Sequence, residues 1–203
     1  MRMNKIYTED DLLAYVNEYG ILPFWSEEGF SASAFSGVHF NSLWNIRERL
    51  VNSKTVVYGR FVNKKATFVS LEVFPYLAAL RRDGYDFDSL TDEGRTPKRE
   101  IDIMTAVGNA PTPSYKLSQT LKMKGFDGAV ASLQNKTYLC LNFAKSYMGT
   151  ALLCRPEDLF GEEYTRSKYG LTPEQNAEQI SRLAKGIFEL DEKTRSKLLS
   201  VAV

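Results

Sequence analysis

The sequence has little histidine, little cysteine and no long apolar run, and each shortage excludes a class of protein. Of its 203 residues, one is histidine and two are cysteine, too few for a zinc site of four Cys/His ligands. No apolar stretch approaches the roughly 20 residues of a bilayer-spanning helix, and no Gly-rich phosphate loop occurs. The first residues also lack the apolar core of a signal peptide. We therefore expect a cytoplasmic protein without membrane contact, metal or cofactor.

The common catalytic constellations are also weak. His39 is the only histidine, so any Ser-His-Asp or Cys-His arrangement must use it. It lies between the apolar residues Val38 and Phe40, which favours a packing or capping role. Cys140 falls in an alternating strand pattern, which indicates a buried, unreactive thiol. Acidic pairs such as Glu27-Glu28 lie in polar surroundings and indicate a solvated face.

Composition is that of a folded globular protein, but the charge is unevenly distributed. Hydrophobic residues make up 43% and charged residues 25%, which argues against a disordered chain. The net charge of +1 divides into −3 over residues 1–94, +6 over 95–155 and −2 over 156–203. A basic centre favours a polyanionic partner. Chance fluctuation over short segments explains the same numbers equally well.

The basic centre has the pattern of a winged helix. One helix is predicted over 97–107 and a second from Thr112-Pro113, with Thr as cap and Pro in the first turn. A third helix follows over 126–136. Alternating residues then predict a hairpin of two strands, 137–143 and 150–154. In this fold the third helix usually enters a DNA groove.

The two cysteines both fall on the predicted hairpin. If its turn centres near Ser146-Tyr147, Leu139 faces Cys154 and Cys140 faces Leu153. The two thiols then point to opposite sides of the sheet, because side chains alternate along a strand. We therefore expect no disulfide between them.

Candidate nucleic-acid contacts surround the third helix. Phe126, Val130 and Leu133 are predicted to be buried, which turns Asp127, Gly128, Ala131, Ser132 and Asn135 outward. Asn135 is the best base-reading side chain, with Gln134 at the margin, and the lysines suit phosphates. The candidate contacts are Lys116, Lys122, Lys124, Gln134, Asn135, Lys136 and, at the hairpin tip, Lys145. The small, nearly uncharged outward face also suits a protein partner.

The flanking segments extend this pattern to an α+β fold. Thr8 is predicted to cap a first helix, and Thr172-Pro-Glu-Gln175 has the form of a capping box. Between them the sequence predicts helices over 42–51 and 72–82, a hairpin of strands 55–61 and 66–70, and a polar boundary over 83–95. We predict two winged-helix-like units, 1–90 and 95–160, with C-terminal helices in 161–203 packing on both.

Several short motifs, taken in order, resemble a known family. They look like bacterial proteins described as AlkZ-related, which are similar to the winged-helix AlkZ/YcaQ DNA glycosylases. The resemblance covers roughly residues 8–160. The motifs that carry it are Leu43-Trp44, Tyr58-Gly-Arg-Phe61, Thr67-Phe-Val-Ser70, Phe74-Pro-Tyr76, Phe126-Asp-Gly-Ala129 and Leu133-Gln134.

The resemblance implies a fold that holds duplex DNA and, in the glycosylases, cleaves the N-glycosidic bond of alkylated or crosslinked bases. Those enzymes carry a Gln-x-Asp or Gln-x-Gln motif after their first helix, which positions water and stabilises the developing sugar cation. The matching place here holds Pro23-Phe24-Trp25, which can do neither. His39 and Leu43-Trp44 resemble remnants of the stretch that follows. The resemblance thus supports the fold more than the activity.

Three hypotheses for function follow. The first is a non-catalytic protein that binds duplex DNA mainly through phosphates. The second is a protein-interaction or structural module that binds a protein partner or self-associates, without nucleic-acid contact. The third is a divergent glycosylase that uses Asp10, Asp11 or Glu27.

Overall fold

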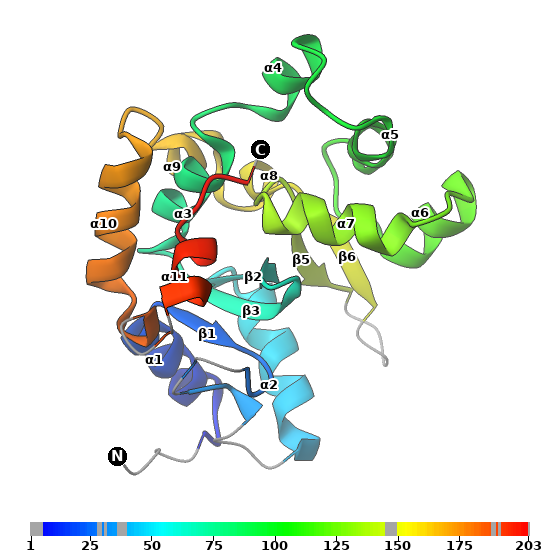
Figure 1. Ribbon diagram of the computed structural model, residues 1–203. Coiled ribbons are helices and arrows are strands. Elements are labelled where there is room, and N and C mark those ends of the chain that lie inside the picture. The colour runs from blue at the N-terminus through cyan, green and yellow to red at the C-terminus, as the bar shows by residue number, and fades with distance from the viewer. Residues whose placement is uncertain are drawn as a thin grey trace.

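The protein is a mixed helix and strand structure built around two small antiparallel sheets (Figure 1). A computed structural model describes residues 6–27, 30, 32–35, 40–144, 150–187, 190 and 192–202. Helices account for 53% of the chain and strands for 15%. This mixture, with small antiparallel sheets, is compatible with the predicted α+β class.

The first sheet is formed by residues from the N-terminal third. Its strands β1 (Ile21–Pro23), β2 (Val56–Val62) and β3 (Lys65–Ser70) lie in the order β1-β3-β2. Helices α1 (Glu9–Tyr19) and α2 (Phe40–Asn52) accompany it. The predicted cap of α1 is confirmed, because the Thr8 hydroxyl accepts from the Asp11 backbone N–H and the Asp11 carboxylate accepts from the Thr8 N–H. This reciprocal pair satisfies two donors that the helix leaves free.

The second sheet is formed by the basic centre of the chain. Three helices, α5 (Lys98–Val107), α6 (Ser114–Leu121) and α7 (Phe126–Asn135), precede the hairpin of β5 (Cys140–Phe143) and β6 (Ala151–Cys154). A short strand β4 (Thr112–Pro113) pairs with β6, which gives the order β4-β6-β5. The predicted succession of three helices and a hairpin is confirmed.

Two local predictions in this segment are wrong. Thr112-Pro113 is a strand rather than the start of α6, and the Thr112 hydroxyl donates backward to the carbonyl of Ala110 instead of capping the helix. In the hairpin, Cys140 lies directly opposite Cys154 rather than Leu153. The Ala144 N–H donates to the Thr150 carbonyl, which moves the centre of the turn by half a residue. A one-residue change of register brings both thiols to one face.

The remaining helices connect and cover the two sheets. They are α3 (Phe74–Arg82), α4 (Phe87–Asp92), α8 (Pro156–Phe160), α9 (Glu162–Arg166), α10 (Pro173–Leu183), the 3-10 turn η2 (Lys185–Ile187) and α11 (Glu192–Leu198). The capping box of Thr172 and Gln175 is confirmed at α10. The polar stretch 83–95 contains α4, whose Phe87 and Leu90 are buried.

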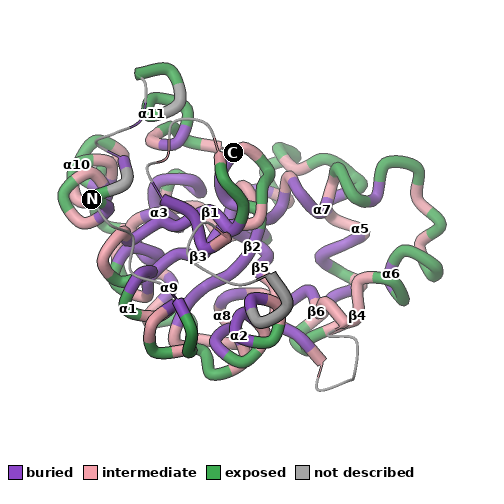
Figure 2. The backbone as a smooth tube through the Cα atoms, turned by 90° about the horizontal axis from the view of Figure 1, so that it is seen from below, coloured by how far each residue is buried: buried purple, intermediate pink, exposed green. Residues whose placement is uncertain are grey.

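Three apolar clusters hold these elements together. One lies between the first sheet, α1 and α2, and another lies under α5, α6, α7 and the second hairpin. The third joins the first sheet and α3 to the C-terminal helices through residues such as Ile180, Ile187 and Leu198, and it includes Cys140 and Cys154. Figure 2 shows the buried tube running through the strands, while much of α6 and α10 is exposed. The C-terminal helices therefore share one apolar cluster with residues of both sheets.

Candidate nucleic-acid interface

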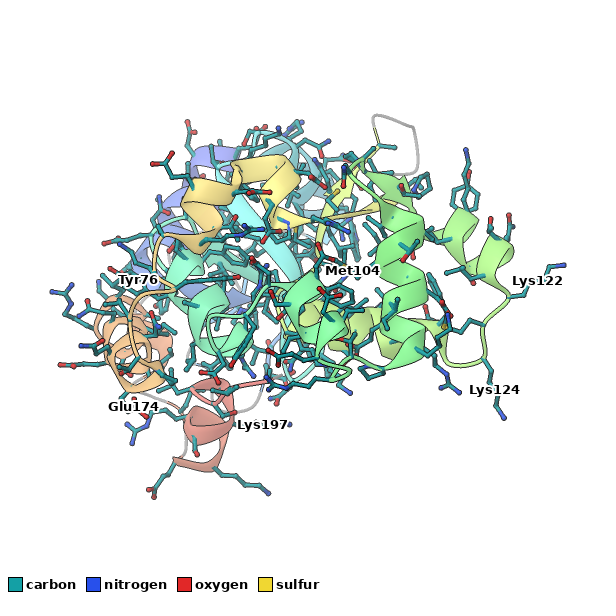
Figure 3. The ribbon with its side chains drawn as sticks, turned by 90° about the horizontal axis from the view of Figure 1, so that it is seen from above. Tyr76, Met104, Lys122, Lys124, Glu174 and Lys197 are labelled. Atoms are coloured by element: carbon teal, nitrogen blue, oxygen red, sulfur yellow. The ribbon has the colours of Figure 1, made fainter. Side chains whose placement is uncertain are left out.

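The most exposed basic surface lies on α6 and the turn after it. On this helix only Leu117 is buried. The outward residues, which we call the α6 surface, are Tyr115, Lys116, Ser118, Gln119, Thr120, Lys122 and Lys124. Figure 3 shows Lys122 and Lys124 projecting from one end of the molecule. All seven side chains are neutral or positively charged.

The lysines of the α6 surface are free to meet an anion. Lys116, Lys122 and Lys124 form no ion pair with any residue in the described ranges. Arg99 adds a fourth cation, since its Nη1 would lie 3.1 Å from a Cβ at Gly125 in the same turn. Asp127, exposed at the start of α7, is the acidic residue beside them. The local charge therefore stays positive.

Helix α7 is much less accessible than the sequence predicts. Ala131, expected to face outward, is 5% exposed, and Gln134 is 1% exposed. The Gln134 side-chain oxygen accepts the Arg60 backbone N–H at 2.9 Å, which ties α7 to β2. Helix α7 thus packs against α5 on one face and β2 on another. The packing against β2 could not be seen from the sequence, because the two segments lie 74 positions apart.

The other predicted contacts on α7 are also partly occupied. Lys136 is largely buried and its Nζ lies 3.0 Å from Glu100 Oε2, while Ser132 donates to the same carboxylate at 2.8 Å. Asn135 is half-buried at the opposite end of α7 from the turn that carries Lys122 and Lys124. Lys145 and His39 lie outside the described residues. The structure therefore groups Lys116, Lys122 and Lys124, and it separates Gln134, Asn135 and Lys136 from them.

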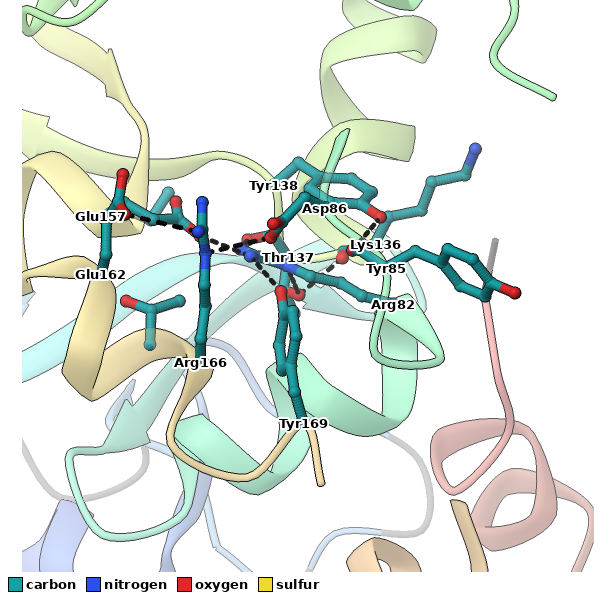
Figure 4. A network of polar contacts seen from close by, with 12 residues as sticks. Arg82, Tyr85, Asp86, Lys136, Thr137, Tyr138, Glu157, Glu162, Arg166 and Tyr169 are labelled. Carbon is teal, nitrogen blue, oxygen red and sulfur yellow. Dashed lines mark hydrogen bonds and ion pairs between the residues drawn. The ribbon is translucent and has the colours of Figure 1, made fainter. Parts of the chain in front are cut away.

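A charged cleft of about 180 Å³ lies near the ends of α3, α4, α8 and α9. Arg82 is fully buried beneath it, donating to Glu157, to the Tyr169 hydroxyl at 2.8 Å and to the Thr137 carbonyl at 2.6 Å (Figure 4). Arg166 lies 3.0 Å from Asp86. Acidic side chains outnumber arginines five to three in the lining. The cleft is thus a poor site for a phosphate, and Arg82 and Arg166 in its lining act as structural ties.

The place that matches the glycosylase motif is filled by aromatic rings. Pro23 ends β1, Phe24 is 1% exposed, and Trp25 is 40% exposed. Phe24 lies 5.1 Å from Trp25 and 5.1 Å from Trp44 between ring centroids. Asp11, one of the alternative acids, is engaged in the α1 cap, and hydrogen bonds from Tyr7 and Thr8 lower its pKa. The rings pack against each other and supply no general base.

Comparison with known proteins identifies the family. The family model described as AlkZ related matches residues 6–200. The chain belongs to the AlkZ-related family. The AlkZ-related match extends past the predicted end near residue 160 and takes in the C-terminal helices. No curated protein and no solved structure matches the chain.

Two features are absent from the described part of this AlkZ-related chain. No helix in the described part is long and apolar enough to cross a membrane. Within the same residues, no group of three or more His, Cys, Asp and Glu side chains is placed to hold a metal ion.

Proposed function

We propose that this AlkZ-related protein is a non-catalytic, winged-helix protein that binds duplex DNA mainly through phosphates. The observation that carries the proposal is the α6 surface, where three unpaired lysines and four uncharged side chains lie together. Lysines at such a surface displace condensed counterions from DNA, which supplies affinity without reading sequence. The family relationship to DNA glycosylases supports the same partner.

The order of elements supports the winged-helix assignment. Helix α5, strand β4, helices α6 and α7, and hairpin β5-β6 follow one another, and β4 pairs with the second strand of the hairpin. The first sheet has the corresponding order β1-β3-β2, with α1 and α2 before its hairpin. Two winged-helix-like units, 1–90 and 95–160, account for both sheets.

Helix α6, with the turn after it, is the element we assign to the DNA. Helix α7 is the usual reading helix of this fold, but here its Ala131 and Gln134 are covered and its Lys136 is paired. The α6 surface offers hydroxyl, amide and ammonium groups with Tyr115 half-exposed at its start. Such groups suit phosphate oxygens and base edges alike.

The test is fluorescence anisotropy of a labelled random-sequence duplex. Three phosphate contacts give a salt slope of about −2.7, so affinity falls about 40-fold between 50 and 200 mM salt. The double variant Lys122→Glu/Lys124→Glu should abolish most of the binding. Its matched control is Lys64→Glu/Lys65→Glu, which changes the charge equally at the exposed turn between β2 and β3.

The outcomes separate the hypotheses. An equal loss of DNA binding in the two double variants would show that the α6 surface is not the specific contact with DNA. Absence of binding by the unaltered protein at low salt would overturn the proposal and favour a protein-interaction module. Because Pro23, Phe24 and Trp25 supply no carboxylate or amide side chain, we expect no abasic sites after incubation with alkylated duplex DNA. Their formation would instead support a divergent glycosylase.

A further inference from the structure

A second cavity lies between α4, the start of α5 and the end of α7. This cavity, which we call the α4 cavity, has a volume of about 320 Å³ and is lined by three apolar or aromatic and four polar side chains. Its apolar wall consists of Phe87, Leu90 and Tyr138, and the two rings meet edge to face with their centroids 5.3 Å apart. Ligand pockets are typically roughly 300 Å³ or larger, with apolar walls and a few placed polar groups. The α4 cavity has this form.

The polar part of the lining carries more positive than negative charge. Arg95 and Lys136 contribute two cations, Glu100 contributes one carboxylate, and Thr96 contributes a hydroxyl group. Glu100 is 5% exposed, and its two oxygens accept from the Lys136 ammonium at 3.0 Å and from the Ser132 hydroxyl at 2.8 Å. Both members of the Glu100–Lys136 pair line the cavity, so this pair is part of its wall. The excess of one positive charge comes from Arg95.

Arg95 is able to exchange its present partner for a ligand. Its Nη1 lies 3.2 Å from Oε2 of Glu93, which is outside the lining, and both side chains of this pair are nearly half exposed. An ion pair so exposed contributes little to stability, so replacing Glu93 by a ligand carboxylate costs little. The Thr96 hydroxyl makes no hydrogen bond with any residue in the described part of the chain. Two neighbouring residues therefore offer donors to an acceptor in the cavity.

The volume and the charge of the cavity together define the ligand. A cavity of about 150 Å³ holds benzene, so the α4 cavity, at about 320 Å³, has room for a ring of that size with an acidic group attached. A phosphate monoester carries close to two negative charges at neutral pH. A carboxylate carries one charge, which matches the single excess positive charge of the lining.

We propose that the α4 cavity is a binding site for a small organic acid that joins a compact apolar body to one carboxylate. The apolar body packs against the apolar wall. The carboxylate accepts from the Arg95 guanidinium and the Thr96 hydroxyl, and the Lys136 ammonium adds attraction from the opposite segment of the chain. The cavity contains no residue of the α6 surface, so this site does not depend on the binding of DNA.

The test is an NMR titration of the full chain with benzoate at pH 7, in which the backbone amide shifts give the Kd. Benzamide has the same shape without the charge, and it should bind about fivefold more weakly or worse, because one partly exposed ion pair is worth about that factor. Benzylamine carries the opposite charge and should not bind. Magnetisation transfer between the benzoate ring protons and the Leu90 methyl groups should place the ligand in the cavity.

Variants connect this binding to the lining. Arg95 is exposed, so Arg95→Gln should fold normally and bind benzoate about fivefold more weakly. The matched control is Arg182→Gln on α10. Arg182 is likewise exposed, has a neighbouring partner in Gln179, and lies outside the lining, so this variant should keep the Kd. Lys122→Glu/Lys124→Glu should also keep it, whether or not that protein has lost DNA binding.

Four results would overturn the proposal. The first is the absence of benzoate binding up to tens of millimolar. The second is a Kd for benzamide or benzylamine equal to that for benzoate, which would mean that the cations do not select the ligand. The third is an equal effect of Arg95→Gln and Arg182→Gln on the Kd. The fourth is benzoate binding without magnetisation transfer to Leu90, which would place the ligand elsewhere.

Discussion

Single residues show how burial sets chemistry in this protein, and the two thiols are the clearest case. Cys140 and Cys154 lie opposite each other in the hairpin, and both are 0% exposed. Burial raises the pKa of Cys154 to about 12 and the pKa of Cys140 well above its usual value. The reactive thiolate is therefore scarce in the native state.

We predict that neither thiol reacts with an aromatic disulfide reagent at pH 8 while the protein is folded. In denaturant both should react at the rate of free cysteine, giving two equivalents. The time course of absorbance measures both states of the same sample. Rapid labelling of one equivalent before denaturation would contradict the buried register of the hairpin.

At the scale of elements, the capping box at the start of α1 makes the stability of this helix end depend on pH. Hydrogen bonds from the Tyr7 and Thr8 backbone N–H groups lower the pKa of Asp11. A carboxylate whose pKa is lowered by folding stabilises the fold above its unfolded pKa, and this contribution is lost as the pH falls through its folded value. The capping box should therefore weaken only in acid.

We predict that Asp11→Asn lowers the urea midpoint at pH 7 and that the difference from the unaltered protein disappears toward pH 2. Asp10→Asn is the matched control, since Asp10 is exposed on the same turn and takes no part in the cap. It should change the midpoint at pH 7 much less. Equal effects of the two substitutions would mean that the cap contributes only through its charge near the helix end.

The elements also show what the sequence could and could not predict. Local signals were sufficient for the helix starting after Thr8, the hairpin of β2 and β3, and the capping box at Thr172, because caps and alternation act within a few residues. The strand at Thr112-Pro113 was missed, since it exists only by pairing with β6. The hairpin register was missed because it depends on one residue in the turn.

The candidate site, too, could be predicted from the sequence only where local pattern decides it. Exposure of Lys116, Lys122 and Lys124 follows from the local pattern. The burial of Gln134 does not, because its partner Arg60 is distant in sequence. The sequence near the buried Arg81 and Arg82 does not indicate which residues surround them. The partners of Arg82 are Glu157 and Tyr169, which lie 75 and 87 positions away in the sequence.

At the scale of the whole molecule, Arg82 connects segments that no sheet joins. It extends from α3 to Thr137 between α7 and β5, to Glu157 on α8 and to Tyr169 before α10. Removing one member of a buried ion pair leaves the other charge uncompensated, which typically costs 3–5 kcal/mol. The network should therefore contribute to the cooperativity of the entire fold.

We predict that Glu157→Gln lowers the free energy of unfolding by about 3 kcal/mol in urea and that fluorescence and far-UV circular dichroism still change together. Glu162→Gln is the matched control. Its pair with Arg166 at 3.3 Å is largely exposed, so the cost should stay below about 1 kcal/mol. Two separate transitions in Glu157→Gln would show that the cooperativity of the fold depends on the Arg82–Glu157 pair.

The proline that ends β1 has a consequence for how molecules of this protein meet one another. Strand β1 is an outer strand of its sheet, is three residues long, and carries Pro23 at its end. An unpaired strand edge invites pairing with a second molecule, and proline removes a donor from that ladder. Because this edge is short and lacks one N–H donor, a neighbouring chain could form few backbone hydrogen bonds with it. This edge therefore resists the strand addition that begins fibre formation.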